Sequence, residues 1–207
     1  MTEPFTTLSG PAAPMPEENI DTDIIFPARF LLITAKAGLG GYAFHDRRYD
    51  ANGVPLPDYV LNKAPFHSAP FIVAGANFGS GSSREQAVWA IAGLGVRCII
   101  APGFGEIFNA NCQRNGVLPI TLPADKVEEL MASAQAGQTF SVDLEAQTLT
   151  VGNRHLSFDI APERKLALLN GWDETAVLLH QFAGDIAEFE TRQKASAPWL
   201  YAKDDAS

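Results

Sequence analysis

The stretch Asn77-Phe78-Gly79-Ser80-Gly81-Ser82-Ser83-Arg84-Glu85-Gln86 lies between a predicted strand and a predicted helix. Before it, the apolar run 71–74 has the length and composition of a buried strand. After it, apolar residues recur at helical spacing over 85–94, and Gly95 can end that helix. A strand, a glycine-rich turn and a helix in this order indicate an α/β fold.

The same alternation continues on the C-terminal side. Two further strands are predicted at residues 98–101 and 117–120, with a helix at 106–114 between them. Such a series favours a partly parallel sheet. Beyond it, the sequence predicts a helix, three strands that include a hairpin, and C-terminal helices that break near two glycines: 125–136, 139–143, 148–151, 155–158, 163–169 and 174–192.

These elements predict an α/β domain with β/β/α layering, in which helices flank the partly parallel sheet. We expect a single domain over residues 1–207, with a C-terminal helical extension at about 162–207. Residues 10–20 contain one glycine and three prolines and are expected to form a loop. Residues 36–58, rich in Gly, Pro and Asp, are expected to form a long loop, which inside a domain is commonly functional.

Composition and charge exclude several classes of protein. The chain has 207 residues, of which 46% are hydrophobic and 19% charged, and its formal net charge is −9 at pH 7. We expect no nucleic-acid binding, because phosphates repel an acidic chain that has no run of basic residues. No apolar run approaches the ~20 residues of a membrane helix, and the N-terminus lacks the pattern of a secretory signal. The sequence therefore predicts a cytoplasmic protein without a membrane segment.

Few residues are candidates for binding a metal. Cys98 and Cys112 cannot alone hold an iron–sulfur cluster, which takes about four thiolates. Asp21 and Asp23 could bind a hard cation, but such pairs are more often turn and helix caps. The four histidines show no spacing typical of metal ligands. We therefore expect no metal site in this chain.

The glycine-rich turn is the main candidate for chemistry. Ligands of open α/β sheets bind at the carboxyl ends of strands, where a helix N-terminus offers free N–H groups to an anion. Gly79 and Gly81 allow close backbone approach, and Arg84 presents a planar fork that matches a carboxylate. Ser82 and Glu85 also fit a capping box, in which Ser82 would be a structural cap. A phosphate-binding loop and a serine-hydrolase elbow are disfavoured, because their motifs are absent.

Four segments, in order along the chain, resemble the swivelling domain of the aconitase superfamily. They are residues 19–31, the stretch 77–91 with its Gly-Ser-Ser-Arg-Glu core, 104–120 and 169–175. The last segment is similar to a C-terminal turn in small subunits of the isopropylmalate dehydratase family. The chain departs from that family at two positions of the turn, with Ser80 in place of Cys and Gln86 in place of His, and has Lys165 where His is frequent.

The resemblance implies one half of a two-chain hydro-lyase. It implies a separate large subunit that carries a [4Fe–4S] cluster, in a heterodimer or heterotetramer, and no cofactor in this chain. The substrate would be a small dicarboxylate, 2-isopropylmalate, converted to 3-isopropylmalate by dehydration and rehydration in leucine biosynthesis. Ser82 would be the general base, acting as an alkoxide, while Gly81, Ser83 and Arg84 would bind a substrate carboxylate.

Residues 39–48 fall where that family has its substrate-recognition loop. We expect Tyr42 and Phe44 to form an apolar wall for the alkyl group, and Arg47 or Arg48 to suit a more acidic side chain. Glycines at 38, 40 and 41 would let this loop close over a substrate.

Two alternative functions stay open. The chain could serve a related hydro-lyase that acts on another alkyl-malate, such as 2-methylmalate or homocitrate. It could also be a non-catalytic binding module with the same fold. The presence of Ser82, Ser83 and Arg84 together favours an enzyme, because a purely structural role needs no arginine there.

Overall fold

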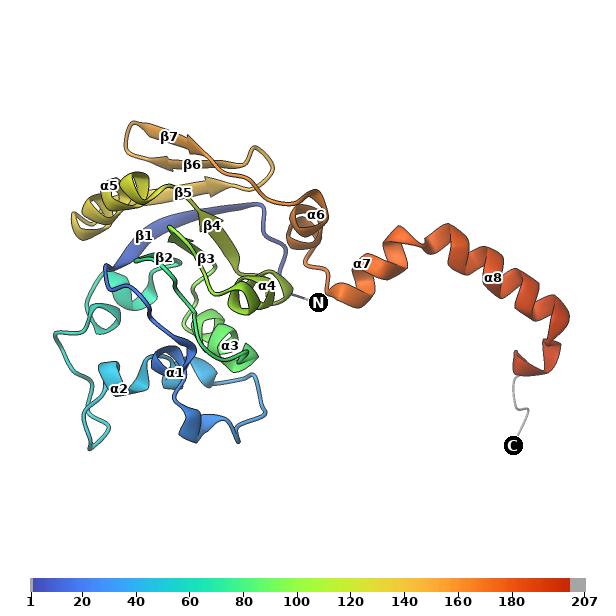
Figure 1. Ribbon diagram of the computed structural model, residues 1–207, viewed down its shortest axis with the longest axis horizontal. Coiled ribbons are helices and arrows are strands. Elements are labelled where there is room, and N and C mark those ends of the chain that lie inside the picture. The colour runs from blue at the N-terminus through green and yellow to red at the C-terminus, as the bar shows by residue number, and fades with distance from the viewer. Residues whose placement is uncertain (1, 202–207) are drawn as a thin grey trace.

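The computed structural model describes residues 2–201, and its centre is a seven-stranded sheet (Figure 1). The order across the sheet is β4-β3-β2-β1-β5-β6-β7. Strands β4 to β1 run parallel, whereas β5, β6 and β7 pair antiparallel. The strands are β1 (Thr7–Met15), β2 (Phe71–Ala74), β3 (Cys98–Ala101), β4 (Leu118–Thr121), β5 (Thr139–Asp143), β6 (Thr148–Val151) and β7 (Arg154–Ser157). The predicted α/β class with a partly parallel sheet is confirmed.

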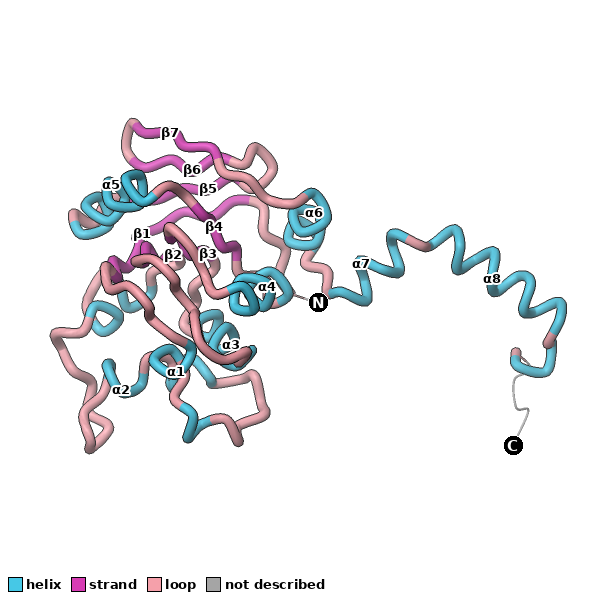
Figure 2. Tube along the Cα trace, viewed as in Figure 1, coloured by secondary structure: helices cyan, strands magenta, loops and turns pink. Residues whose placement is uncertain are grey.

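The helices lie on both faces of the sheet and beyond its edge (Figure 2). The α-helices of the described residues are α1 (Thr22–Ile25), α2 (His45–Arg48), α3 (Glu85–Gly93), α4 (Glu106–Arg114), α5 (Ala124–Gln135), α6 (Pro162–Asn170), α7 (Glu174–Gln181) and α8 (Ala183–Ser196). Short 3-10 helices join them: η1 (Ala28–Phe30), η2 (Leu39–Tyr42), η3 (Val60–Asn62), η4 (Phe66–Ser68) and η5 (Pro198–Leu200).

The prediction of a loop over residues 10–20 is wrong for its first half, because β1 runs through it as a central strand. Ala12 and Ala13 pair with β2, while Gly10 and Pro11 pair with β5. A Cβ atom at position 10 would lie 2.6 Å from the ring of Pro70, so glycine permits a close approach here. Local composition suggested a turn, but the pairing on both sides of the strand decides the conformation.

Side chains alternate across the parallel strands, and the sheet therefore separates two apolar cores. Along β2, Ile72 and Ala74 pack into the core that contains side chains of α1, α3 and α4. Phe71 and Val73 point the other way, into the core that contains α5, α6 and the antiparallel strands. The glycine-rich turn belongs to the first side, because Phe78 is buried in that core.

Part of the long loop predicted over 36–58 is packed against the domain, namely residues 39–50, whereas 51–58 are exposed. Leu39 and Phe44, in or beside η2 and α2, are both 0% exposed. Arg48 holds this segment through hydrogen bonds from Nη1 to the Gly40 carbonyl at 2.9 Å and from Nε to Asn62 Oδ1 at 3.2 Å. One-turn helices leave no periodic pattern in a sequence, which is why the packing was not predicted.

The C-terminal helices differ in how they meet the domain. Helix α6 packs on it through Leu168, which is 2% exposed. Helices α7 and α8 instead lead away from the sheet as an arm (Figure 1). The helical extension predicted for 162–207 is thus helical across most of its described part, and residues 202–207 lie outside the described residues. Among residues 2–201, no helix is both long enough and apolar enough to cross a membrane.

Candidate functional site

Three chain segments meet at the carboxyl ends of β1, β2 and β3. Isolated parallel bridges join Asp21 to Ser80 and Phe78 to Phe104. The backbone N–H of Thr22 also donates a hydrogen bond to the Ser80 carbonyl at 2.9 Å. The glycine-rich turn is thereby held between the residues that follow β1 and those that follow β3, where open α/β sheets bind ligands.

Gly79 is required at the centre of this arrangement. Its φ is +72°, in the left-handed region that favours glycine, and a Cβ there would lie 2.2 Å from the Phe108 ring. Gly81 also has a positive φ, +93°, but its surroundings are more open. Gly79 therefore lets the turn lie against α4, and Gly81 redirects the chain so that the next residues are exposed.

The alternative interpretation of Ser82 as the cap of a capping box is not supported by the structure. Helix α3 begins at Glu85, and its N-cap is Arg84, with no side chain capping it. The Ser82 carbonyl instead accepts the Arg84 N–H at 2.9 Å and the Thr22 hydroxyl at 3.1 Å. The Ser82 Oγ lies 3.4 Å from Thr22 Oγ1 in an exposed turn. Its hydroxyl is therefore free of a structural role at the helix end.

The N-terminus of α3 keeps unused backbone donors. In the part of the chain that the structure describes, the N–H groups of Ser83, Glu85 and Gln86 donate no hydrogen bond. Such groups, with the positive end of the helix dipole, favour a carboxylate or an alkoxide. Ser83 and Gly81 are exposed beside them, so the backbone here can receive an anion.

Arg84 is the positive group of the site. Its side chain is 19% exposed and forms an ion pair with Asp23, from Nη1 to Oδ1. The Nη1 atom is buried, yet its N–H groups are not aligned to donate a hydrogen bond to any described residue. The guanidinium thus keeps hydrogen-bonding capacity toward a ligand carboxylate.

The acidic pair at the start of α1, Asp21 and Asp23, has structural partners. Asp21 caps that helix by accepting the Ile24 N–H at 2.8 Å, and Asp23 binds Arg84.

Burial raises the pKa of the Cys98 and Cys112 thiols, which keeps them neutral. Within residues 2–201 no group of three or more His, Cys, Asp or Glu side chains could hold a metal ion.

The three residues predicted for substrate recognition differ in how exposed they are and in what they contact. Tyr42 is half-buried, and its ring lies 4.7 Å from that of Phe30, centroid to centroid. Phe44 is 0% exposed in the core, so it can affect a substrate-facing surface only by supporting the residues that form it. Arg47 binds Glu17, with Nη2 donating to Oε1 at 2.7 Å, and this guanidinium lowers the pKa of Glu17.

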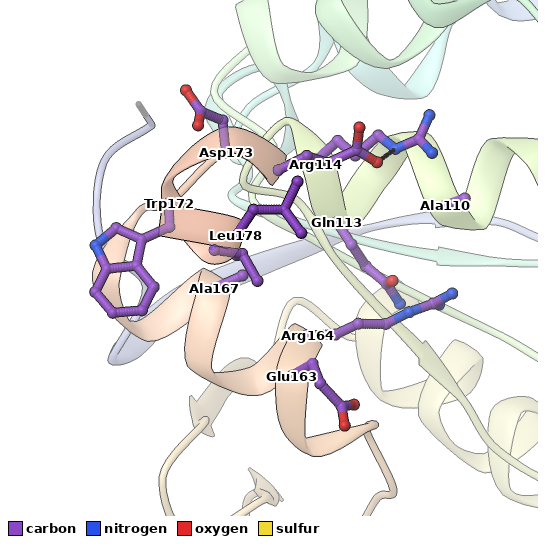
Figure 3. Close-up of a pocket in the computed structure, with 11 residues that line it drawn as sticks. Ala110, Gln113, Arg114, Glu163, Arg164, Ala167, Trp172, Asp173 and Leu178 are labelled. Carbon is purple, nitrogen blue, oxygen red and sulfur yellow. Dashed lines mark ion pairs between the residues drawn. The ribbon is translucent and has the colours of Figure 1, made fainter. Parts of the chain in front are cut away.

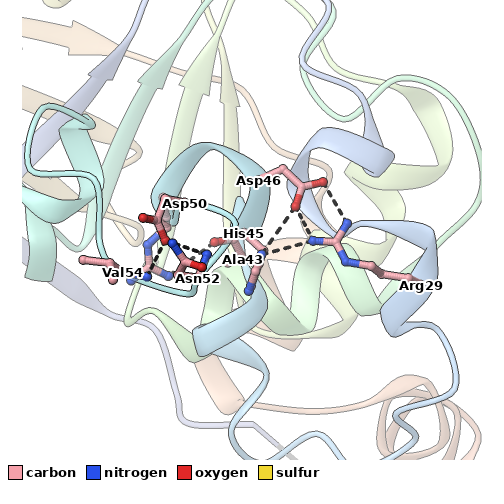
Figure 4. A network of polar contacts seen from close by, with 8 residues as sticks. Arg29, Ala43, His45, Asp46, Asp50, Asn52 and Val54 are labelled. Atoms are coloured by element: carbon pink, nitrogen blue, oxygen red, sulfur yellow. Dashed lines mark hydrogen bonds and ion pairs between the residues drawn. The ribbon is translucent and has the colours of Figure 1, made fainter.

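A polar network fixes α2 to η1 (Figure 4). Arg29 Nη1 donates to Asp46 Oδ2 at 2.8 Å, and Arg29 Nη2 lies 3.1 Å from His45 Nδ1. The hydrogen bond from Arg29 lowers the pKa of Asp46. These contacts tie residues 39–48, the segment expected to recognise the substrate and called the recognition segment below, to η1.

Two cavities on the described chain contain no residue of the turn in their linings. The larger, about 380 Å³, lies between α4, α6 and α7, where Arg114, Arg164 and Trp172 contribute to its wall (Figure 3). The smaller, about 270 Å³, is lined by Arg47 and by Tyr59, whose pKa is raised by burial. The chemically suited groups stand on an exposed turn, so cavity size does not mark the candidate site.

Comparisons with known proteins identify the family of this chain. The family model of the aconitase C-terminal domain matches residues 2–125, the LeuD_N model matches 128–162, and the model of the C-terminal domain of the 3-isopropylmalate dehydratase small subunit matches 181–203. A protein of Paramagnetospirillum magneticum named 3-isopropylmalate dehydratase small subunit is 48% identical over 96% of this chain and 100% of its own length. One of the same name from Rhodospirillum centenum is 46% identical over 95% of this chain and 98% of that protein. The chain belongs to the 3-isopropylmalate dehydratase small-subunit family.

A solved structure supports the same family. The crystal structure titled 3-isopropylmalate dehydratase (leuD) from Methanocaldococcus jannaschii aligns with a TM-score of 0.63 at 25% identity. The alignment covers 88% of this chain and 99% of that one.

For this member of the 3-isopropylmalate dehydratase small-subunit family, sequence reasoning missed two residues of the site. Thr22 is 1% exposed and contacts Ser82, and Asp23 pairs with Arg84. Both lie in the segment 19–31 that resembles the family's N-terminal loop, and that resemblance was the available signal.

Proposed function

We propose that this chain is the small subunit of a two-chain hydro-lyase that interconverts 2-isopropylmalate and 3-isopropylmalate in leucine biosynthesis, in the cytoplasm. The observation that carries the assignment is the turn itself. An exposed Ser82 hydroxyl, a half-buried Arg84 whose guanidinium keeps hydrogen-bonding capacity, and unused N–H groups at the start of α3 stand together in the turn that follows β2. Full-length relatives that are 44–48% identical carry the small-subunit name, which supports the substrate.

Ser82 is the proposed base. As an alkoxide, its Oγ takes the proton from the carbon next to a substrate carboxylate during dehydration, while the C–O bond on the neighbouring carbon breaks and the hydroxyl leaves toward the partner subunit, whose cluster would act on it as a Lewis acid. The Ser82 hydroxyl returns a proton to carbon when water is added back. That carbon acid is weak, so the alkoxide needs preorganised donors in a site from which water is excluded. The Thr22 hydroxyl donates to the Ser82 carbonyl in this structure and lies 3.4 Å from Ser82 Oγ, so a rotation of its O–H would turn its one proton to the alkoxide. The N–H of Ser83, the next residue, is a further unused donor.

Arg84, Ser83 and Gly81 are the proposed carboxylate site. The Arg84 guanidinium offers charge-assisted hydrogen bonds, and the helix end offers backbone N–H groups. Asp23 fixes the guanidinium by an ion pair and so limits its freedom before substrate binds. A substrate held this way presents its reacting carbon to a fixed base, which lowers the entropic part of the barrier.

The partner is the proposed source of the remaining chemistry. The described residues supply no ligand set for a [4Fe–4S] cluster, since they hold two buried cysteines and no cluster of three suitable side chains. We therefore assign the cluster to a large subunit, in a heterodimer or heterotetramer, and expect this chain alone to be inactive. The exposed turn then becomes one wall of a cleft, and the large subunit provides the opposite wall.

The alkyl group is proposed to meet the recognition segment. Tyr42 is the accessible part of its apolar wall, and Phe44 supports that wall from the core. Arg47 is engaged by Glu17, which leaves it less suited to an additional acidic group. This arrangement favours isopropylmalate over homocitrate, while 2-methylmalate remains the alternative substrate.

The decisive experiment is Ser82→Ala in the complex reconstituted with the large subunit. A lost base should lower kcat by about 10²–10⁴-fold. The melting temperature should stay that of the wild type, because Ser82 caps no helix. Ser68→Ala, an exposed serine in η4, is the matched control and should leave kcat unchanged.

Near-normal kcat in Ser82→Ala would remove the base from this chain and leave a binding module. A wild-type complex that prefers 2-methylmalate would instead replace the substrate and retain the hydro-lyase.

A further inference from the structure

The loop of residues 31–38 is the least supported part of the site's surroundings. It leaves η1, which follows α1, and returns at η2, where Gly40 packs so closely on α3 that a Cβ would lie 2.3 Å from the Gly93 carbonyl oxygen. At the start of the loop Leu32 is 92% exposed. Within the described chain, the backbone of residues 34–37 makes no hydrogen bond to other backbone groups.

One side chain anchors this stretch. Lys36 Nζ lies 4.5 Å from the centroid of the Trp89 ring, over its face, and donates a hydrogen bond to Asn115 Oδ1 at 3.2 Å. Trp89 lies on α3, and Asn115 follows the last residue of α4. The loop is thus attached to both helices through one ammonium group.

Asn115 uses its full hydrogen-bonding capacity in this network. Its Oδ1 accepts from Lys36 and from Trp89 Nε1 at 2.9 Å, and its Nδ2 donates to Glu85 Oε1 at 2.8 Å and to the Asn111 carbonyl at 2.9 Å. These partners fix the orientation of the amide, because a flipped group would place NH₂ against two donors and oxygen against a carboxylate.

Because of where Glu85 lies, the network also affects which N–H groups of the turn stay free. Glu85 is the first residue of α3, directly after Arg84, and a glutamate near a helix start can reach back to its free N–H groups. Here the carboxylate is held by Asn115 instead. The N–H groups of Ser83, Glu85 and Gln86 therefore remain available to an external anion.

We propose that Lys36 and Asn115 are positioning residues: Lys36 holds the 31–38 loop along α3, and Asn115 keeps the Glu85 carboxylate away from the substrate-carboxylate site. The inference rests on the proposed function and deepens it. Neither residue touches substrate. Loss of Lys36 would loosen the 31–38 loop. Loss of Asn115 would let the Glu85 carboxylate compete with substrate for the N–H groups at the start of α3.

The first test needs neither substrate nor partner. Lys36→Gln in the full chain should raise the rate of thermolysin cleavage between residues 31 and 33 about two- to fivefold, the range of a lost exposed cation–π contact. Lys36→Arg, which keeps the cation, should cut at the wild-type rate. Lys63→Gln is the matched control, because Lys63 pairs with Asp58 in another loop. Equal cleavage of Lys36→Gln and the control would overturn the loop anchor.

The second test uses the reconstituted complex. Asn115→Asp removes the donors and repels Glu85, and should raise KM about tenfold with a smaller change in kcat. The double variant Glu85→Gln, Asn115→Asp restores an amide–carboxylate hydrogen bond with the donor exchanged, and should recover most of the KM. An unchanged KM in Asn115→Asp, or a double variant no better than the single one, would overturn the role of Asn115. A complex without isomerase activity in the wild type would instead defeat the proposed function, while the cleavage result would still decide the loop anchor.

Discussion

The domain and the C-terminal arm of this chain treat apolar side chains in opposite ways. In the domain, two clusters of buried residues fill both faces of the sheet. In the arm, from α7 to Tyr201, no helix has a buried residue among those described. Most of the large apolar side chains that are exposed on the described chain lie there: Leu178, Leu179, Phe182, Phe189, Trp199, Leu200 and Tyr201.

The difference shows that the packing of the domain, and not the arm, fixes the positions of the site's side chains. The turn with Ser82 is held by strand ends, by α1 and by α4, so its geometry depends on the packing of the whole domain. A helix of 14 residues such as α8 is marginal in water without packing, and the arm has little support from its own chain. Changes in the domain should therefore cost far more than changes in the arm.

Phe44→Ala should have the largest effect on the isolated chain. Phe44 is 0% exposed, and truncation of a core phenylalanine costs about 3–5 kcal/mol in the free energy of unfolding. Denaturant unfolding of the wild type and the variant measures the loss. Phe44→Leu, which fills more of the cavity, should lose clearly less. A loss below about 1 kcal/mol would mean that the recognition segment is not packed as part of the domain.

Arg84→Lys should weaken substrate binding in the reconstituted complex. An ammonium keeps the ion pair with Asp23 but loses the planar fork, so KM should rise about 10–100-fold while the melting temperature stays constant. Steady-state kinetics checks this. Arg192→Lys is the matched control in the arm, where Arg192 pairs with Glu188 on the surface of α8, and its KM should equal that of the wild type. Equal KM values for both variants would exclude Arg84 from the carboxylate site.

Tyr42→Ala should change specificity by a smaller factor. Removing apolar wall beside the alkyl group should lower the ratio of kcat/KM for isopropylmalate to that for methylmalate about five- to tenfold, since small apolar differences in a pocket change binding by ~1–3 kcal/mol. The ratio cancels general damage to the enzyme. A ratio equal to the wild-type value would show that the segment does not contact the alkyl group.

The turn illustrates what could be predicted from sequence and what could not. Periodicity and length predicted the strand β2 and the helix α3, because their apolar residues repeat locally. The chemistry proposed for Ser82 and Arg84 rests on resemblance and residue type. Their contacts with Thr22 and Asp23 join residues about 60 positions apart, and no local pattern encodes such a pairing.

Two local sequence patterns suggested structure that the fold does not adopt, and for the same physical reason. The capping box of Ser82 satisfied the local motif, but Gly81 and the hydrogen bond from Arg84 to the Ser82 carbonyl delay the helix. The strand β1 contains Gly10 and Pro11, which suggested a loop, but strands on both sides fix its conformation. In each case tertiary contacts override a local preference.

Phe189→Ala should have the smallest effect and completes the comparison. Phe189 carries the same side chain as Phe44, but it lies on α8 and is 54% exposed. Truncation of an exposed side chain creates no cavity and is usually within about 0.5 kcal/mol of neutral, and alanine favours the helix. The free energy of unfolding of the isolated chain should therefore equal that of the wild type, in contrast to Phe44→Ala. A loss above about 2 kcal/mol would mean that the arm packs on the domain in solution, because only a buried phenylalanine is that costly to remove, and the two regions would then form one cooperative unit.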